Sequence, residues 1–349
     1  MMDYKLELNE ETTKTINDFR HSVNLQPLKA SSLGQYVGNY NTMSANRELD
    51  GGEHYFHKPD DVFEWLKTTK SQRTKKLLNN NSRRNYLNMV IQFAPLCGVC
   101  PDMIQQYINH RDSLNEIYNV NNELSEYTED EKEKIVTEAQ IDSLLNKLRK
   151  VMNALEVWKG SKTLNELSNS EEEMLTYFIL MTFYKTHRLR NDIASLRVMK
   201  LADYNKLKNK GTKEDPVIKE HNLLIYGQRE LFMVLHDFKT NKNGEGLSIN
   251  ITDKKLKMYL GKFIRLIPES KDVHRPLIRY RKGEQMTAHQ LTLFLQKNNM
   301  EHLGSPLSTR LLRKIFYSEK YGELIDEMKK DAKENLHSTG TAMNIYTKK

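Results

Sequence analysis

The sequence predicts a mainly α-helical chain with one small antiparallel β-sheet, divided into a helical N-terminal domain and a larger α+β C-terminal domain. From residue 60 onward, most segments carry apolar residues at helical spacing. Between residues 221 and 251, three short runs rich in Ile, Leu, Val and Phe have the composition of strands. An acidic, polar stretch over residues 123–138 has the composition of a linker and separates the two domains.

Length and charge limit the classes of protein to consider. The chain has 349 residues, enough for two domains with their own cores, and 38% of its residues are hydrophobic. Its formal net charge of +8 favours a polyanionic partner, nucleic acid before membrane, because Lys and Arg neutralise phosphates and release counterions. No run of about 18 apolar residues exists, so we expect no membrane-spanning helix and no membrane partner.

Residues 1–58 carry little periodicity and are rich in Asn, Gly and Ser. This composition is typical of loops, so we predict a flexible N-terminal arm with no catalytic residues.

A helical domain is predicted over residues 59–122. Its first helix, DDVFEWLKTTK, begins with an acidic cap at Asp60. The next helix has apolar residues at helical spacing and ends near Pro95, and PDMIQQYINHRDSLNEIYN forms a third. Between the last two helices, Cys97 and Cys100 form a lone CxxC, which we interpret as two small residues in a helix-to-helix corner because one pair cannot complete a zinc site.

The helical domain contains a run of basic residues with no acid among them. On a helix pair such a run is either an ordinary solvated face or a surface that contacts phosphates, and the basic character of the whole chain favours the second interpretation. The seven residues are Lys67, Lys70, Arg73, Lys75, Lys76, Arg83 and Arg84.

The second domain is predicted over residues 139–349. It begins with helices over 137–155 and 168–186, the second capped by Ser168 or Ser170. The runs HNLLIY, ELFMVLHDF and LSINI follow as strands, and the Asn-Gly pair in FKTNKNGEG predicts a turn between the last two. Helices return over 253–267, 287–300 and 308–322.

Several basic and nucleophilic residues of this domain suit phosphodiester chemistry. Cleavage needs a nucleophile, cations that hold the charge on the non-bridging oxygens, and an acid for the leaving 5′-oxygen. No acidic cluster has metal-ligand spacing, which disfavours a two-metal nuclease. The candidates are Arg190, Lys239, Arg310, Arg313, His337 and Tyr346.

Four segments resemble the tyrosine recombinase, or phage-type integrase, family. TFYKTHRLRNDIASLR is similar to the first arginine box, and DFKTNKNGEGLSINI to the segment with the β-hairpin lysine. RLLRKIF resembles the HxxR box, and LHSTGTAMNIY resembles the closing block in which a tyrosine follows a histidine by nine residues. With the basic helical domain the resemblance covers roughly residues 60–349, and it implies a helical core-binding domain followed by an α+β catalytic domain.

The resemblance implies a role for each matched residue. Tyr346 would attack the scissile phosphate to give a 3′-phosphotyrosine and a free 5′-hydroxyl. Arg190 and Arg313 would bind the phosphoryl oxygens with planar, permanently charged groups. Lys239 would protonate the leaving 5′-oxygen, and His337 would hydrogen-bond the phosphate.

Arg310 stands where the family has the histidine that serves as candidate base. A guanidinium stays protonated at any working pH, so Arg310 cannot be a general base. It can still stabilise the phenolate and lower its pKa. We therefore expect slower chemistry, or base catalysis by water, and not loss of activity.

Smaller departures leave alternatives open. Asp192 lies two residues after Arg190, where the family has an acid three residues after, so Asp192 is a candidate for bracing an arginine and Arg188 remains a rival for the catalytic place. Lys242 rivals Lys239 in the same turn. Only three residues follow the terminal tyrosine, so we expect no additional C-terminal helix for subunit contacts of the kind found in the family.

The resemblance implies a site-specific DNA recombinase or integrase that uses no metal or other cofactor. Its partners would be double-stranded DNA and three further copies of the chain, as a homotetramer built from two dimers. The alternatives are a type IB topoisomerase and a non-catalytic DNA-binding or packaging protein on the same fold. The Asn- and Lys-rich composition favours a virus or mobile element with an AT-rich genome, and hence an intracellular location with DNA, in the host nucleus if that host is eukaryotic and otherwise in the cytoplasm.

Overall fold

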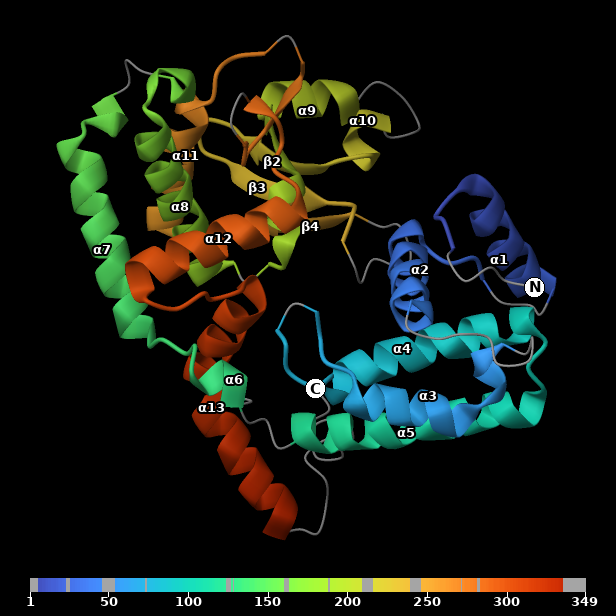
Figure 1. The fold of residues 1–349 in the computed structure, drawn as a ribbon. Coiled ribbons are helices and arrows are strands. Elements are labelled where there is room, and N and C mark those ends of the chain that lie inside the picture. The colour runs from blue at the N-terminus through green and yellow to red at the C-terminus, as the bar shows by residue number, and fades with distance from the viewer. Residues whose placement is uncertain are drawn as a thin grey trace. The chain divides into compact units, whose positions relative to one another are not determined.

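The computed structural model describes twelve stretches of the chain: residues 6–22, 26–45, 54–72, 74–123, 127, 129–159, 163–187, 189–208, 216–238, 246–270, 272–280 and 283–334. The chain divides into two compact units, Met1–Glu126 and Tyr127–Lys349 (Figure 1). The division lies inside the acidic stretch 123–138. None of the helices in the described stretches has the length and apolar character needed to cross a bilayer.

Unit 1 is helical in all its described elements. The described α-helices are α1 (Glu10–Ser22), α2 (Ala30–Ser44), α3 (Pro59–Thr68), α4 (Asn80–Phe93) and α5 (Pro101–Glu123), and the described 3₁₀ helices are η2 (Tyr55–His57) and η3 (Ala94–Cys97). Phe56, Leu66, Phe93 and Tyr107, all buried, bring η2, α3, α4 and α5 together in one core. The three helices predicted between residues 59 and 122 are therefore present, although the second begins later than its sequence suggests.

The prediction of a flexible arm over residues 1–58 is wrong for the part that the structure describes. Helices α1 and α2 fall in this region, and Ile16, Leu33, Val37 and Tyr40 are buried in the core of unit 1. The Tyr40 hydroxyl also lies 3.0 Å from Nε2 of His54, so a polar group of this core is satisfied internally. Burial of an apolar stripe stabilises α2 even though most residues between its buried positions are weak helix formers.

The sequence suggested that the whole basic run lies on a pair of helices. In the structure part of the run lies in a loop. Between α3 and α4 the chain forms a short loop closed by an isolated antiparallel bridge between Lys70 and Leu77. The Ser71 carbonyl accepts from Lys75 N at 2.9 Å, and Ser71 N donates to the Lys76 carbonyl at 2.8 Å. Lys75 has a φ of 57°, a left-handed conformation that interrupts any helix.

Cys97 and Cys100 occupy a helix-to-helix corner, as predicted. Cys97 ends η3, Cys100 precedes α5, and Gly98 between them has a φ of 74°, which allows the sharp reversal. Both cysteines are unpaired with each other, and burial raises the pKa of the Cys97 thiol to about 12. A thiol so hard to ionise is a poor nucleophile or metal ligand at neutral pH.

Unit 2 combines helices with a five-stranded sheet. Its helices are α6 (Glu129–Lys132), α7 (Glu138–Ala154), η4 (Val157–Lys159), η5 (Leu164–Glu166), α8 (Asn169–Thr186), η6 (Asn191–Ser195), α9 (Leu201–Lys208), α10 (Pro216–Lys219), α11 (Lys254–Leu266), α12 (Ala288–Leu303) and α13 (Thr309–Glu334). Its strands are β1 (Leu196–Lys200), β2 (Asn222–Tyr226), β3 (Leu231–Leu235), β4 (Leu247–Asn250) and β5 (His274–Pro276).

The helix starts follow from capping residues. Thr137 caps α7 and Ser168 caps α8, each in a capping box that satisfies donors at the helix N-terminus. Of the two serines considered for α8, Ser168 is the cap. Asp253 caps α11 by accepting from Leu256 N at 2.7 Å.

The sheet is mixed, not antiparallel as predicted. Its strand order is β4-β3-β2-β1-β5, and β1 pairs parallel to β2 with Leu196 opposite Asn222. The other pairings are antiparallel, including the predicted β3–β4 pair. The sequence did not reveal β1, which follows η6 directly, or β5, which has three residues.

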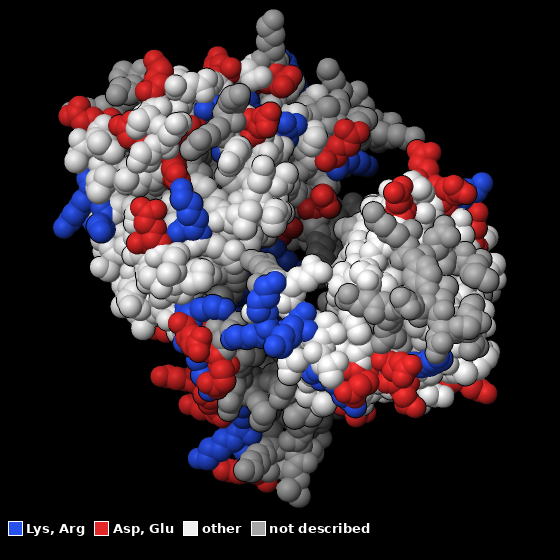
Figure 2. Space-filling view, viewed as in Figure 1, with Lys and Arg blue, Asp and Glu red and all other residues white. Residues whose placement is uncertain are grey.

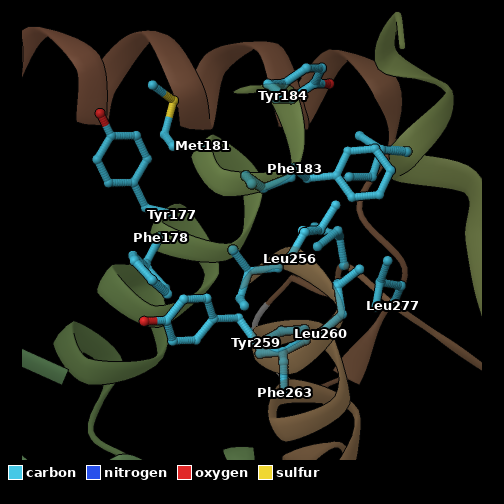
Figure 3. Close-up of a cluster of buried hydrophobic side chains, with 14 of the residues drawn as sticks. Tyr177, Phe178, Met181, Phe183, Tyr184, Leu256, Tyr259, Leu260, Phe263 and Leu277 are labelled. Atoms are coloured by element: carbon cyan, nitrogen blue, oxygen red, sulfur yellow. The ribbon is translucent and has the colours of Figure 1, made fainter. Parts of the chain in front are cut away.

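The core of unit 2 lies between one face of the sheet and the long helices. Figure 3 shows part of it, where Phe178 of α8 packs against Tyr259 of α11. A smaller cluster with Tyr204 of α9 and Ile218 of α10 covers the other face of the sheet. Because both faces of the sheet are covered, successive residues of the central strand β2 are buried and do not alternate with exposed ones.

The second half of the predicted linker belongs to unit 2. The Lys314 Nζ of α13 lies 2.6 Å from both carboxylate oxygens of Glu131, and the Ser305 hydroxyl donates to the Lys134 carbonyl at 2.6 Å. The Tyr127 hydroxyl also donates to the Ser318 hydroxyl at 3.0 Å. The acidic composition thus serves in part for ion pairing with α13, and the prediction of a linker extending to residue 138 is wrong.

Candidate functional site

A pocket of about 710 Å³ in unit 2 brings together two of the predicted catalytic arginines. It is formed by η6, the chain just after β3, the N-terminal part of α12 and the first turns of α13. The lining residues important below are Arg190, Asn191, Asp192, Asp237, Thr309 and Arg313.

Arg190 lies where helix α8 gives way to η6. Helix α8 ends at Thr186, and Arg190 is the residue that precedes η6. Its backbone carbonyl accepts a hydrogen bond of 3.0 Å from the hydroxyl of Tyr184, whose side chain is 1% exposed. The buried tyrosine therefore fixes the backbone of Arg190, while the arginine itself remains exposed at the pocket.

Asn191 and Thr309 connect the segments that carry the two arginines. The Thr309 hydroxyl donates to Oδ1 of Asn191 at 2.8 Å, and Arg313 Nε donates to the Thr309 carbonyl at 3.3 Å. Asn191 Nδ2 in turn donates to the Ala288 carbonyl at 3.1 Å and to the Thr292 hydroxyl at 2.8 Å. The segment of Arg190 is thereby attached to α12 and to the first turn of α13.

The two arginines influence each other electrostatically. Burial lowers the pKa of the Arg313 guanidinium, and the positive charge of Arg190 lowers it further. Tyr184 and Asp192 act in the opposite direction. An anion between the two guanidiniums would offset this repulsion.

Two carboxylates border the arginine pair. Burial raises the pKa of Asp192, the nearby Arg190 lowers it, and the negative charge of Asp237 raises it. Asp192 is half-buried and Asp237 is exposed at the end of β3. The two arginines and the two carboxylates give the pocket lining a formal net charge of zero, so any preference for an anion is local to the guanidiniums and not a property of the pocket as a whole.

Other predicted catalytic residues are placed differently or lie outside the described stretches. Arg310 is exposed on α13 and does not line the pocket, although it precedes Arg313 by three residues. Outside the described residues are Lys239, His337 and Tyr346, together with the rivals Arg188 and Lys242.

The predicted phosphate-contacting residues of unit 1 gather around the α3–α4 loop. Lys67 is exposed in the last turn of α3, and the loop lysines Lys70, Lys75 and Lys76 are exposed. Figure 2 shows basic side chains gathered over this loop. Half-buried Arg83 and Arg84 lie near the start of α4, and Arg73 is outside the described residues.

Sequence reasoning did not identify the polar residues that hold the pocket together. Tyr184 looked like one more apolar residue of a buried helix, and Asn191 and Thr309 are common residue types without periodic spacing. Among these residues, only Asn222 could have been noticed in the sequence. It directly precedes the apolar run LLIY, and a polar side chain at the start of a buried strand needs a hydrogen-bond partner.

Within the described stretches, no group of three or more His, Cys, Asp or Glu side chains is placed to hold a metal ion. No protein-family model, curated protein or solved structure matches this chain.

Proposed function

We propose that this chain is a site-specific DNA recombinase or integrase that cleaves DNA through Tyr346. The observation that carries the proposal is the pocket in which Arg190 and Arg313, far apart in sequence, lie together with the residues that lead from β3 to Lys239. A pair of guanidiniums beside a lysine-bearing segment suits a phosphodiester whose non-bridging oxygens gain charge during cleavage.

In the proposed reaction the Tyr346 phenolate attacks the phosphorus and the bond to the 5′-oxygen breaks. Arg190 and Arg313 hold the two non-bridging oxygens, and their mutual repulsion is relieved as negative charge accumulates between them. Lys239 gives a proton to the leaving 5′-oxygen, and His337 donates a hydrogen bond to the phosphate. The resulting 3′-phosphotyrosine preserves the energy of the bond for religation to another strand.

Arg310 has a separate part in the proposal. Since its guanidinium is exposed on the helix of Arg313 and does not line the pocket, it does not share the phosphate-binding task. We assign it electrostatic stabilisation of the phenolate, and the proton of Tyr346 then goes to water. An Arg310→Ala variant should keep slow cleavage, and complete loss of cleavage would contradict this assignment.

The α3–α4 loop of unit 1 supplies the proposed DNA contacts outside the pocket. Its lysines are exposed on a loop that three backbone hydrogen bonds and one isolated bridge close, which reduces the ordering required when DNA binds. Double-stranded DNA is the proposed partner, and the proposed active assembly is a homotetramer of two dimers.

A covalent-capture experiment tests the enzyme proposal. The substrates are labelled duplexes that contain a randomised core and a nick close to it. After cleavage the short fragment between the cleavage position and the nick diffuses away, so its 5′-hydroxyl cannot religate the strand and the 3′-phosphotyrosine remains trapped. We expect a labelled adduct whose linked peptide contains Tyr346, and sequencing of the captured DNA identifies the target site. Absence of any adduct with the wild-type chain would contradict an enzymatic function and leave a DNA-binding or packaging protein.

Tyr317 provides a matched control for the nucleophile. It is an exposed tyrosine on α13, one turn beyond Arg313 and close enough to influence its pKa. Tyr346→Phe should abolish the adduct and Tyr317→Phe should preserve it, whereas the reverse result would assign the nucleophile to α13.

Two DNA assays separate the recombinase from the topoisomerase. Exchange between two captured sites on one plasmid requires strand transfer between duplexes, whereas relaxation of a supercoiled plasmid needs only cleavage and religation on one duplex. We expect recombination products, and relaxation without recombination would favour the type IB topoisomerase.

A further inference from the structure

Three side chains that can carry positive charge lie together in the sheet of unit 2, outside the arginine pocket. They are Arg197 of β1, His221 just before β2 and His274 of β5, and we call them the arginine–histidine cluster. The imidazole rings of His221 and His274 are in edge-to-face contact, with ring centroids 4.6 Å apart and an interplanar angle of 78°. All three residues are half-buried.

The strand register brings these side chains to one face of the sheet. His274 of β5 lies opposite Met199 of β1, and Arg197 precedes Met199 by two residues. Opposite residues share a face and residues two apart on a strand return to it, so Arg197 and His274 are diagonal neighbours. Leu223 of β2 lies opposite Arg197 and is buried with Met199 on the face that α9 and α10 cover. His221 precedes Leu223 by two residues.

The members of the cluster repel one another when they are charged. Burial lowers the pKa of His221, and the charge of Arg197 lowers it further. Burial also lowers the pKa of His274, followed again by Arg197 and more weakly by His221. Glu220 raises the pKa of His221, and Asp272 and the backbone of His274 raise that of His274. Both carboxylates are exposed, and each acts less strongly than Arg197.

Two nitrogen atoms of the cluster lack a hydrogen-bond partner. Nε of Arg197 and Nδ1 of His274 are buried, and neither makes a hydrogen bond of good geometry with the part of the chain that the structure describes. Buried polar atoms in folded proteins nearly always have a partner, so each such atom needs an explanation. A ligand with several acceptor oxygens and a negative charge would supply partners and offset the repulsion together.

The cluster lies beside segments that form the arginine pocket. His221 precedes Asn222, which is 1% exposed and whose Nδ2 donates to the Ser195 hydroxyl and the Asp237 carbonyl, both at 2.7 Å. Its Oδ1 accepts from the backbone N of His236 at 2.8 Å and of Asp237 at 2.9 Å. Ser195 and Asp237 both line the pocket. The cluster and the pocket therefore lie near the same end of the sheet.

We propose that Arg197, His221 and His274 bind a phosphate of the DNA backbone other than the one that is cleaved. A phosphodiester is charged and offers several acceptor oxygens to one guanidinium and two imidazoles. The choice of DNA over a small oxyanion follows from the position of the cluster near the pocket, and this part rests on the proposed function. The affinity of the cluster for an oxyanion does not depend on cleavage.

The first experiment follows the imidazole signals of the full chain by NMR while sulfate is added. Sulfate keeps its charge over the range in which histidine titrates, so a change of affinity with pH comes from the protein. Bound sulfate should raise the pKa of His221 and of His274, because an anion favours the charged imidazole. Sulfate should therefore bind more tightly as pH falls through the raised pKa values, by about tenfold for each histidine that becomes charged.

Matched substitutions assign the signals and supply the control. His221→Gln and His274→Gln should each remove one responding signal and about tenfold of the tightening at low pH. His302 is a half-buried histidine of α12 that stacks on Tyr177, with ring centroids 5.4 Å apart. Its signal should not respond to sulfate, and His302→Gln should leave the response of the cluster unchanged.

The second experiment measures duplex DNA binding by fluorescence anisotropy at several salt concentrations. Arg197→Met keeps the apolar stem and removes the charge, so it should abolish the sulfate response and reduce the slope of log K against log salt concentration by about 1. If Arg197→Met fails to fold, His221→Gln decides the question, since it should weaken DNA binding by about tenfold at low pH and leave it unchanged at high pH. His302→Gln should bind DNA like wild type.

Different failures have different meanings. If Arg197→Met and His221→Gln bind sulfate and DNA like wild type, the inference is overturned. If these variants lose the sulfate response but keep wild-type DNA binding, the cluster takes a small oxyanion and its assignment to the DNA backbone is overturned. If wild type binds DNA through the cluster but forms no covalent adduct, the proposed cleavage fails and this inference stands.

Discussion

Replacing Asn191 by alanine tests whether one side chain couples the two arginines of the pocket. In wild type its amide bonds to Ala288, Thr292 and Thr309 and so joins η6 to α12 and α13. The truncation removes all three hydrogen bonds and introduces no new charge.

The size of the effect follows from the burial of the groups left behind. The Ala288 residue is exposed, so water can replace the lost donor at its carbonyl, but Thr309 is 7% exposed and its hydroxyl loses its acceptor. A buried hydroxyl without a partner costs about 1–3 kcal/mol, and the remaining hydrogen bonds add about 0.5–1 kcal/mol. We therefore expect Asn191→Ala to lower the free energy of unfolding of unit 2 by about 1.5–4 kcal/mol.

A double-mutant cycle with Thr309→Val isolates the contact. Once the hydroxyl is gone, truncating Asn191 no longer leaves it without an acceptor, so the double variant should be about 1 kcal/mol more stable than the sum of the single changes predicts. Urea denaturation followed by Trp158 fluorescence in a Trp65→Phe background measures unit 2, because Trp158 packs against Tyr259 in its core. If the proposed function holds, covalent cleavage by Asn191→Ala should also fall by about 10²-fold.

Additivity would refute the coupling. A coupling energy below about 0.3 kcal/mol means that Asn191 and Thr309 act independently and that their hydrogen bond contributes nothing measurable. A cycle between Asn298→Ala and Thr309→Val supplies the reference, since Asn298 bonds to Glu173 and Phe294 and not to Thr309. This cycle should be additive.

Three further predictions concern other parts of the chain. Burial and the nearby His57 lower the pKa of His54 to about 4, so protonation of His54 favours the unfolded state. The unfolding free energy of unit 1 should therefore drop by up to about 3 kcal/mol as pH falls from 6.5 to 4. His54→Asn should remove this part of the pH dependence, measured by Trp65 fluorescence in a Trp158→Phe background. Gly246→Ala should lower the stability of unit 2 by about 1–3 kcal/mol in the same kind of urea titration, because the added methyl group overlaps the His236 ring, and an unchanged midpoint would show that the ring moves aside at no cost. The last prediction concerns the three loop lysines Lys70, Lys75 and Lys76. Replacing all three by alanine should reduce the slope of log K for DNA binding against log salt concentration by about 2–3, measured by fluorescence anisotropy. A loss of affinity with an unchanged slope would show that these lysines do not contact phosphates.

The fold was predictable from sequence where periodicity and capping chemistry agree. Thr137 and Ser168 cap helices α7 and α8 in capping boxes with Gln140 and Glu171, and buried apolar residues follow in both helices. Helix α2 was missed because its buried residues, such as Leu33 and Tyr40, alternate with Gly, Asn and Ser, and only tertiary packing stabilises such a sequence as a helix. The short β5 depends entirely on its partner β1, a long-range pairing that no local pattern reports.

The candidate site was predictable only in its charged members. Arg190 and Arg313 stand out because they fall in segments that resemble a known family, and the structure does place both at one pocket. Asn191 and Asn222 are important through the geometry of their hydrogen bonds, which depends on where four separate segments meet. No spacing along the chain encodes such a meeting point, so these residues become visible only in three dimensions.

The wide separation of the two arginines also has a consequence for the growing chain. Arg313 follows Arg190 by 123 residues, so at the 5–20 residues per second typical of protein synthesis the second cation emerges about 6 to 25 s after the first. During that interval η6 lacks both its hydrogen-bond donor Thr309 and the helix that completes the pocket. A nascent chain that has not yet reached α13 therefore lacks one of the two guanidiniums, and the pair is complete only once α13 has been synthesised.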